Sequence, residues 1–86
     1  MQQFTYKIEA DFAIHFGPAG RLANIVSHYP DTDAVIEMGN RIANISKPMK
    51  VATMGIRKGD KVTVSCEGPS ETELLEVLHQ YFEDHM

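Results

Sequence analysis

The chain has 86 residues, which is enough for one small domain with a single hydrophobic core. Hydrophobic residues make up 43% and charged residues 23%, as in average soluble domains, and no apolar run approaches the ~18 residues that a membrane span needs. The net charge of −4 argues against nucleic acid or an anionic membrane as the main partner. Residues 1–10 lack the basic start and apolar centre of a signal peptide, so we expect a cytoplasmic protein. The single cysteine cannot form an internal disulfide, so packing must hold the core together.

The first half of the chain predicts a strand and a helix. Residues 3–10 alternate strictly between apolar and polar side chains, which is typical of a half-buried strand. Residues 18–29 show the apolar spacing of a helix, and Pro18 stands where a first helical turn tolerates proline. We therefore expect residues 11–17 to form a loop between the strand and the helix.

The middle of the chain predicts a hairpin and a short helix. Residues 34–45 consist of two apolar runs around a Gly-Asn pair, which is typical of a tight turn between antiparallel strands. Residues 46–54 are predicted to form a short helix, with Ser46 as its N-terminal cap and Gly55 as its left-handed stop.

The last third of the chain predicts a fourth strand and a long helix. Residues 61–67 alternate again, with Cys66 on the apolar side. Ser70 and Glu73 match a capping box, in which the serine hydroxyl binds an amide of the first turn and the glutamate reaches back. A helix with regularly spaced apolar residues is therefore expected to follow Ser70.

The order βαββαβα predicts a single α+β domain spanning residues 1–86. The first and last strands each carry one clean apolar face, so the sheet is expected to bury one side only. The natural architecture is an open-faced β-sandwich, in which three helices pack on one face of a four-stranded antiparallel sheet.

A histidine directly before the first helix is a candidate site for anion chemistry. The amides of a first helical turn and the helix dipole favour an anion, which would lie beside the imidazole of His15. Gly17, which has no side chain, would let the anion approach the backbone closely. A ring nitrogen of such a histidine can accept a phosphoryl group.

Several residues around this histidine and in the second predicted helix resemble one known family. In a chain of this length and element order, the matching residues are Ile14, His15, Pro18, Ala19, Met49, Val51 and Gly55. The sequence is similar to the HPr family, the phosphocarrier proteins of the bacterial sugar phosphotransferase system. The resemblance implies that His15 receives a phosphoryl group from Enzyme I and passes it to a sugar-specific component. The protein would then be a carrier that needs no cofactor and no metal, rather than an enzyme with turnover.

The chain departs from the family within the motif Gly-Ile/Leu-His-Ala-Arg-Pro-Ala. Ala13 replaces the glycine, Phe16 replaces the alanine, and Gly17 replaces the arginine. Loss of one preorganised partner of developing charge typically costs on the order of 3 kcal/mol in the transition state. Arg21 offers a substitute, because helical residues four apart lie above one another and lean towards the N-terminus. A solvated arginine with no such role is an equally open interpretation.

The second predicted helix is a candidate docking surface. Lys47, Lys50 and Arg21 form a possible basic patch in an acidic protein, and Phe16 and Met49 add apolar side chains. In the family this face binds partner proteins, whereas lysines on a short surface helix are usually only solvated. Met54 fits either this surface or the core.

A regulatory serine is the second functional expectation that comes from the family. Some members carry a serine at the start of this helix, which a dedicated HPr kinase phosphorylates, so that the protein becomes a co-effector of a transcriptional regulator. Alignment on Met49 and Gly55 places Lys47 at that position, whereas an insertion would place Ser46 there. Ser46 as an ordinary cap stays open.

The remaining reactive side chains predict structural roles. His28, His79 and His85 have no spacing that favours a zinc site and are expected at the surface. Cys66 is expected to be a buried thiol.

Three functions therefore remain in competition. The first is an HPr-like phosphocarrier, and the second is a regulatory binding module of the same fold with weak or no phosphoryl transport. An adaptor without any phosphorylation is the third. Retention of His15 favours the first, and Gly17 in place of the arginine favours the second.

Overall fold

The computed structural model describes residues 1–10 and 16–86, except for the side chain of Phe16. It contains seven elements in the predicted order βαββαβα. They are β1 (Gln2–Lys7), α1 (Phe16–Ser27), β2 (Asp33–Met38), β3 (Arg41–Asn44), α2 (Pro48–Ala52), β4 (Lys61–Glu67) and α3 (Glu71–His85).

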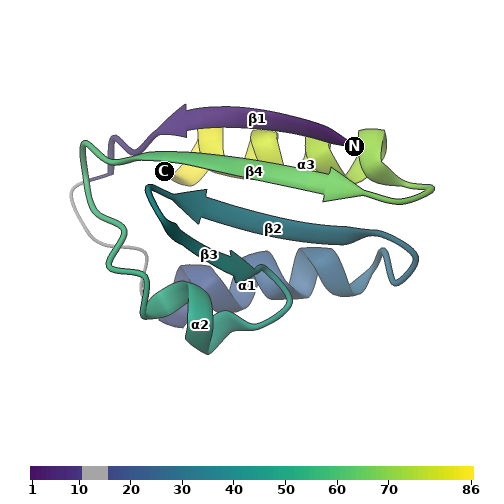
Figure 1. Ribbon diagram of the computed structural model, residues 1–86, viewed down its shortest axis with the longest axis horizontal. Helices are drawn as coiled ribbons and strands as arrows, with labels where there is room; N and C mark the ends of the chain where they lie inside the picture. Colours follow the sequence, from purple (N-terminus) through teal and green to yellow (C-terminus); the bar gives the residue numbers. More distant parts are fainter. Residues whose placement is uncertain (11–15) are drawn as a thin grey trace.

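The four strands form one antiparallel sheet in the order β1-β4-β2-β3. The helices lie on one side of it, with α3 behind β1 and β4, and with α1 and α2 beside β2 and β3 (Figure 1). This arrangement confirms the predicted open-faced sandwich. The fold places the start of α1 next to α2, so that both helices contribute to one surface.

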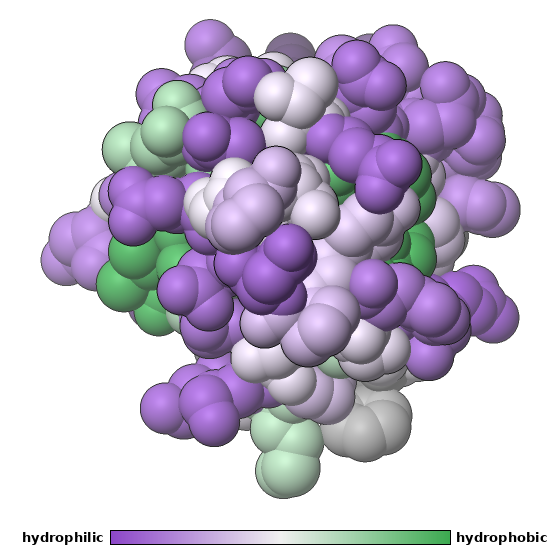
Figure 2. Space-filling model, turned by 90° about the vertical axis from the view of Figure 1, so that its right-hand side faces the viewer, coloured by the Kyte–Doolittle hydropathy of each residue, from purple (hydrophilic) through white to green (hydrophobic). Residues whose placement is uncertain are grey.

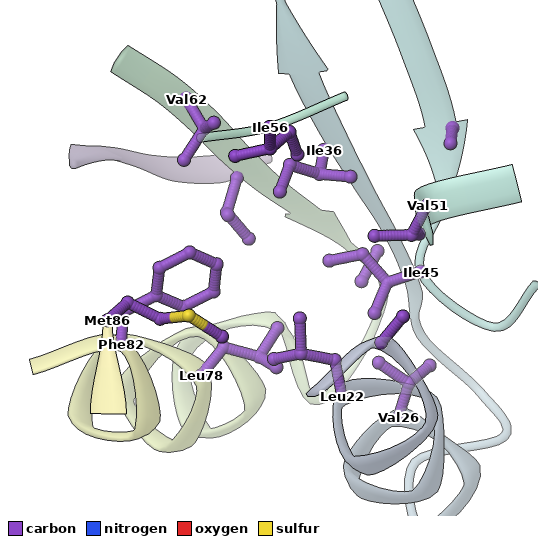
Figure 3. Packing of buried hydrophobic residues seen from close by; sticks show 14 of the residues in the cluster. Leu22, Val26, Ile36, Ile45, Val51, Ile56, Val62, Leu78, Phe82 and Met86 are labelled. Atoms are coloured by element: carbon purple, nitrogen blue, oxygen red, sulfur yellow. The ribbon is translucent and has the colours of Figure 1, made fainter. Parts of the chain in front are cut away.

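The core lies between the sheet and the helices. Val62 and Ile36 point from the strands towards Leu22 of α1 and Phe82 of α3 (Figure 3). Alternation on the strands and the 3.6-residue period on the helices produce these two facing apolar surfaces. Met54, which the sequence left between surface and core, is 4% exposed and belongs to the core.

Strand β1 ends three residues earlier than the alternation predicts, at Lys7. Ile8 is buried, but its amide donates to the carbonyl of Asp60 outside the ladder. The amides of Glu9 and Ala10 donate instead to the carbonyl of Met86, at 2.6 and 2.7 Å. The chain leaves the sheet here because its backbone groups find partners in the last turn of α3.

Helix α1 is shifted by two residues towards the N-terminus relative to the prediction of 18–29. It begins at Phe16, with Pro18 and Ala19 buried in its first turn. The helix ends at Ser27, and the amide of Tyr29 donates to the carbonyl of Val26, three residues earlier. Tyr29 precedes Pro30, and the residue before a proline disfavours helical geometry.

Neither predicted side-chain cap bond forms, although Ser70 is the N-cap residue of α3 as predicted. Ser70 makes no side-chain cap bond, because its hydroxyl lies 3.4 Å from Asp31 Oδ2 and its amide donates to Thr32 Oγ1 at 2.9 Å. Ser46 precedes the N-cap residue Lys47, and its hydroxyl and its amide both donate to Asn44 Oδ1, at 2.7 and 2.9 Å. The partners of Ser70 come from a distant loop, whereas the partner of Ser46 lies two residues before it in the chain.

The second helix is shorter than the predicted 46–54, since α2 ends at Ala52 with Thr53 as its C-cap residue, but the left-handed conformation predicted for Gly55 is confirmed. Gly55 has φ of +76°, a conformation that favours glycine, and it follows Met54 directly. The chain therefore turns sharply away from α2 at this point.

Candidate functional site

The start of α1 is the part of the predicted phosphoryl site that the structure describes. His15, the predicted acceptor, lies outside the described residues, as does the side chain of Phe16. Gly17 lies in the first turn of α1 and is exposed. Its φ is not positive, so the value of glycine here lies in its missing side chain rather than in its backbone freedom.

Arg21 and Gly17 line the same shallow depression, which has a volume of about 530 Å³. Arg21 is exposed and stands one helical turn beyond Gly17. Because side chains of a helix lean towards its N-terminus, a guanidinium at this position can reach the space beside the first turn. The role of Arg21 as a substitute for the motif arginine stays a prediction, because His15 lies outside the described residues.

The other residues around this depression were not predicted as site residues. They are Gly20, Asn24 and Ile25 of α1 and Tyr81 of α3. Asn24 could have been found from its position three residues after Arg21 on the same helix. Tyr81 carries no such signal, because only the packing of α3 beside α1 brings it there.

Helix α2 presents the predicted docking residues at the surface. Lys47 and Lys50 are exposed, and Met49 exposes 69% of its side chain. Val51 is fully buried, which fixes the side of the helix that faces the core. Since α1 packs against α2, Arg21 and these three side chains belong to adjacent helices of one surface.

Large exposed apolar side chains are few among the described residues, and three of the four lie outside α2. The end of the molecule that carries the chain start and the turns into β2 and α3 is mostly hydrophilic, with separate apolar spots (Figure 2). Among the described residues the exposed large apolar side chains are Met1, Ile42, Met49 and Val77. Met49 is the one on α2, which agrees with a contact role for that helix.

Ser46 is exposed just before α2, and its hydroxyl is engaged by Asn44. The side chain of Lys47 follows it and is also exposed. Whether a kinase modifies Ser46 stays a prediction, but Ser46 does not cap α2, because the N-cap residue is Lys47 and no side chain caps this helix.

The histidines show one difference from expectation. His28 and His85 are exposed as predicted, but His79 is half-buried and stacks on Phe4 of β1 with 4.5 Å between ring centroids. The edge of the sheet therefore uses His79 as a packing residue. Within residues 1–10 and 16–86, no group of three or more His, Cys, Asp or Glu side chains could hold a metal ion.

Cys66 is fully buried in β4, as the alternation predicts. Burial, with a smaller contribution from the negative charge of Glu71, raises the pKa of its thiol from 9.0 to about 11. A neutral, inaccessible thiol is a poor nucleophile, so the structural role predicted for Cys66 is supported.

This pKa makes the stability depend on pH in alkaline solution. Between about pH 9 and 11 the unfolded thiol has released its proton and the folded thiol has kept it, so unfolding becomes more favourable as the pH rises. We expect the urea midpoint of the wild-type protein to fall over this interval more steeply than that of Cys66→Ala. Parallel pH profiles of the two proteins would contradict the burial of a neutral thiol.

Comparison with known proteins identifies the family. The family model described as PTS HPr component phosphorylation site matches residues 2–84. The chain belongs to the HPr family. The match includes the segment with His15 and Gly17, so the departures from the motif occur within a member of the family and not in a merely similar fold.

Solved HPr structures have the same architecture. HPr from Thermoanaerobacter tengcongensis is 25% identical over 98% of this chain and 93% of its own, with a TM-score of 0.88. The histidine-containing phosphocarrier protein from Mycoplasma is 23% identical over 96% of this chain and 93% of its own, with a TM-score of 0.90. The Bacillus subtilis catabolite repression containing protein Crh is 21% identical over 100% of this chain and 98% of its own, with a TM-score of 0.77.

No helix among the described residues has the length and apolar character needed to cross a membrane. The HPr fold here is a small sheet with helices on one face and a shallow, open depression beside α1.

Proposed function

We propose that this protein is a phosphocarrier of the phosphoenolpyruvate-dependent sugar phosphotransferase system. His15 accepts a phosphoryl group from Enzyme I and passes it to a sugar-specific component, in the cytoplasm and without a cofactor. The observation that carries the proposal is that α1 begins at the residue after His15, with Gly17 exposed and Arg21 on the same depression, in a chain of the HPr family.

The proposed transfer balances without any further reactant. A neutral ring nitrogen of His15 attacks the phosphorus of phosphorylated Enzyme I, a nitrogen–phosphorus bond forms, and the bond between phosphorus and the donor breaks. A nucleophile of the next protein then attacks the phosphorus, the nitrogen–phosphorus bond breaks, and free His15 is regenerated. The phosphorylated protein is itself the substrate of the next protein, which is why we regard it as a transfer partner and not as a turnover enzyme.

Residues of this chain stabilise the negative charge of the phosphoryl group and leave space for its approach. The positive end of the α1 dipole favours the added negative charge, and the missing side chain at Gly17 leaves the approach open. Arg21 stabilises the charge that develops on the transferring group. Lys47, Met49 and Lys50 on α2, together with Phe16, contact the partner proteins through an apolar centre with a basic rim.

The decisive experiment incubates the protein with phosphoenolpyruvate and Enzyme I and follows its mass. We expect an acid-labile gain of one phosphate in the wild-type protein and no gain in His15→Ala. His28→Ala is the matched control, because His28 is an exposed histidine at the far end of α1. An unphosphorylated wild-type protein, or a phosphorylated His15→Ala variant, would refute the proposal.

A regulatory binding module is the second candidate function, and the replacement of the motif arginine by Gly17 favours it. In that case the surface of α1 and α2 would bind a transcriptional regulator or an enzyme, with phosphorylation of Ser46 by an HPr kinase as its signal. The same mass experiment, followed over time, separates the two functions, since a module of this kind gains phosphate from Enzyme I slowly or not at all.

A further inference from the structure

Arg41 lies outside every predicted site, yet its side chain joins the sheet to the end of α2. Its Nη1 donates a hydrogen bond of 2.6 Å to the carbonyl oxygen of Met54, in a partly buried position. Met54 follows α2 by two residues, and its side chain is buried in the core. A guanidinium that donates to a carbonyl forms a charge-assisted hydrogen bond, which is stronger than a neutral one.

The turn at Gly55 presents this carbonyl to Arg41. With φ of +76°, Gly55 reverses the chain immediately after Met54. A Cβ atom at Gly55 would lie 3.5 Å from Arg41 Nη1, so the guanidinium packs directly against the turn. Arg41, which lies on strand β3, thus fixes the position of the chain where it leaves α2.

Helix α2 needs such support because it is short. It contains five residues, and isolated helices of fewer than about 12 residues are unstable in water. It has no side-chain cap at its start, since Lys47 makes no such bond. Burial of Val51 and Met54 anchors one side of the helix, and the bond from Arg41 anchors its end.

We propose that Arg41 is a positioning residue for partner docking. It does not touch the phosphoryl group, but it keeps α2 ordered, so that Lys47, Met49 and Lys50 are presented to the partner in one arrangement. The role of α2 in docking rests on the proposed function, whereas the link between Arg41 and the order of α2 does not. Loss of the link would populate disordered forms of α2 that must be reordered on binding, which weakens docking without changing the transfer step.

The first test measures the order of α2 directly by hydrogen exchange. In Arg41→Met, which keeps the apolar stem and removes the donor, we expect the amides of Val51 and Thr53 to exchange roughly tenfold faster, as loss of a charge-assisted bond predicts. Amides of α3 should exchange as in the wild type. Arg57→Met is the matched control, because Arg57 is exposed and its recorded bond to Asp60 uses the backbone amide.

The second test measures transfer from Enzyme I. Arg41→Met is expected to raise the KM for this protein about threefold with kcat unchanged, whereas Arg57→Met leaves both unchanged. Arg41→Lys keeps a cationic donor and should recover part of the exchange protection. If Arg41→Met does not fold, the test is the partial loss of α2 protection expected in Arg41→Lys relative to the wild type.

Three outcomes would overturn the proposal. These are equal exchange of α2 in Arg41→Met and Arg57→Met, a loss of kcat instead of a rise in KM, and no recovery of protection in Arg41→Lys. If the wild-type protein accepts no phosphate at all, the proposed function fails, and the exchange comparison alone then decides whether Arg41 orders α2.

Discussion

Replacing Gly68 with alanine is expected to lower the free energy of unfolding by about 3 kcal/mol, from backbone strain and overpacking together. Gly68 has φ of +144°, a conformation that side chains rarely adopt. An added Cβ would lie 2.5 Å from the carbonyl oxygen of Asp31 and 2.7 Å from Cα of Thr32. Both atoms belong to the backbone, so they cannot move aside without disturbing the turn into β2.

A hydrogen-bond network beside Gly68 joins two loops that are distant in the sequence. Thr32 is 4% exposed, and its hydroxyl accepts the amide of Ser70 at 2.9 Å and donates to Asp31 Oδ1 at 3.0 Å. The loop before β2 and the loop before α3 are thereby held together. A side chain at position 68 would push them apart and leave buried polar groups without partners.

Gly59→Ala is the matched control for this prediction. Gly59 also has a positive φ, +93°, but nothing lies within 4 Å of an added Cβ. The control therefore contains backbone strain without the clash, and we expect a loss of about 1 kcal/mol. Urea unfolding followed by linear extrapolation measures both values. If Gly68→Ala loses no more stability than Gly59→Ala, the close approach to Asp31 and Thr32 does not exist in solution.

Replacing Arg21 with alanine is expected to lower the rate of phosphoryl transfer from Enzyme I by about a hundredfold, which corresponds to on the order of 3 kcal/mol in the transition state. The reason is that Arg21 lines the depression beside Gly17, where the family motif would place its own arginine. Removal of its guanidinium leaves the helix dipole to stabilise the transferring group. Single-turnover phosphorylation by excess Enzyme I measures the rate of this step.

Two further variants make this prediction specific. Arg57→Ala removes the same charge from an exposed position in the turn before β4, and we expect it to transfer at the wild-type rate. Gly17→Arg in the Arg21→Ala background restores the motif arginine and should recover most of the lost rate. An unchanged rate in Arg21→Ala would show that Arg21 is only a solvated side chain of α1.

The elements that could be predicted are those with strong local patterns. The fourth strand was predicted at residues 61–67 and occurs there, because Val62, Val64 and Cys66 alternate with polar residues and are all fully buried. The last helix begins directly after Ser70, as expected, because its apolar residues keep the helical period. These features depend on which side of an element is apolar, and that information is local.

The partners of polar side chains could not be predicted in the same way. Ser70 and Ser46 both stand before helices, where serine commonly caps, yet the hydroxyl of Ser70 approaches Asp31 and that of Ser46 binds Asn44. A hydroxyl chooses among all acceptors within reach, and the acceptor near Ser70 is 39 residues away in the sequence. The local motif therefore described a possible bond and missed the one that forms.

The sequence by itself determined the element order, the apolar face of each element, the family resemblance and the candidate histidine, because these depend on residue identity and local period. The net charge of −4, by contrast, describes the whole chain and does not say how charge is distributed over its surface. Only the tertiary structure decided that Arg21 and Tyr81 border one depression, that Arg41 holds the end of α2, and that Gly68 must lack a side chain. Each of these depends on the distance between atoms far apart in the sequence, and that distance is set only when the helices pack on the sheet.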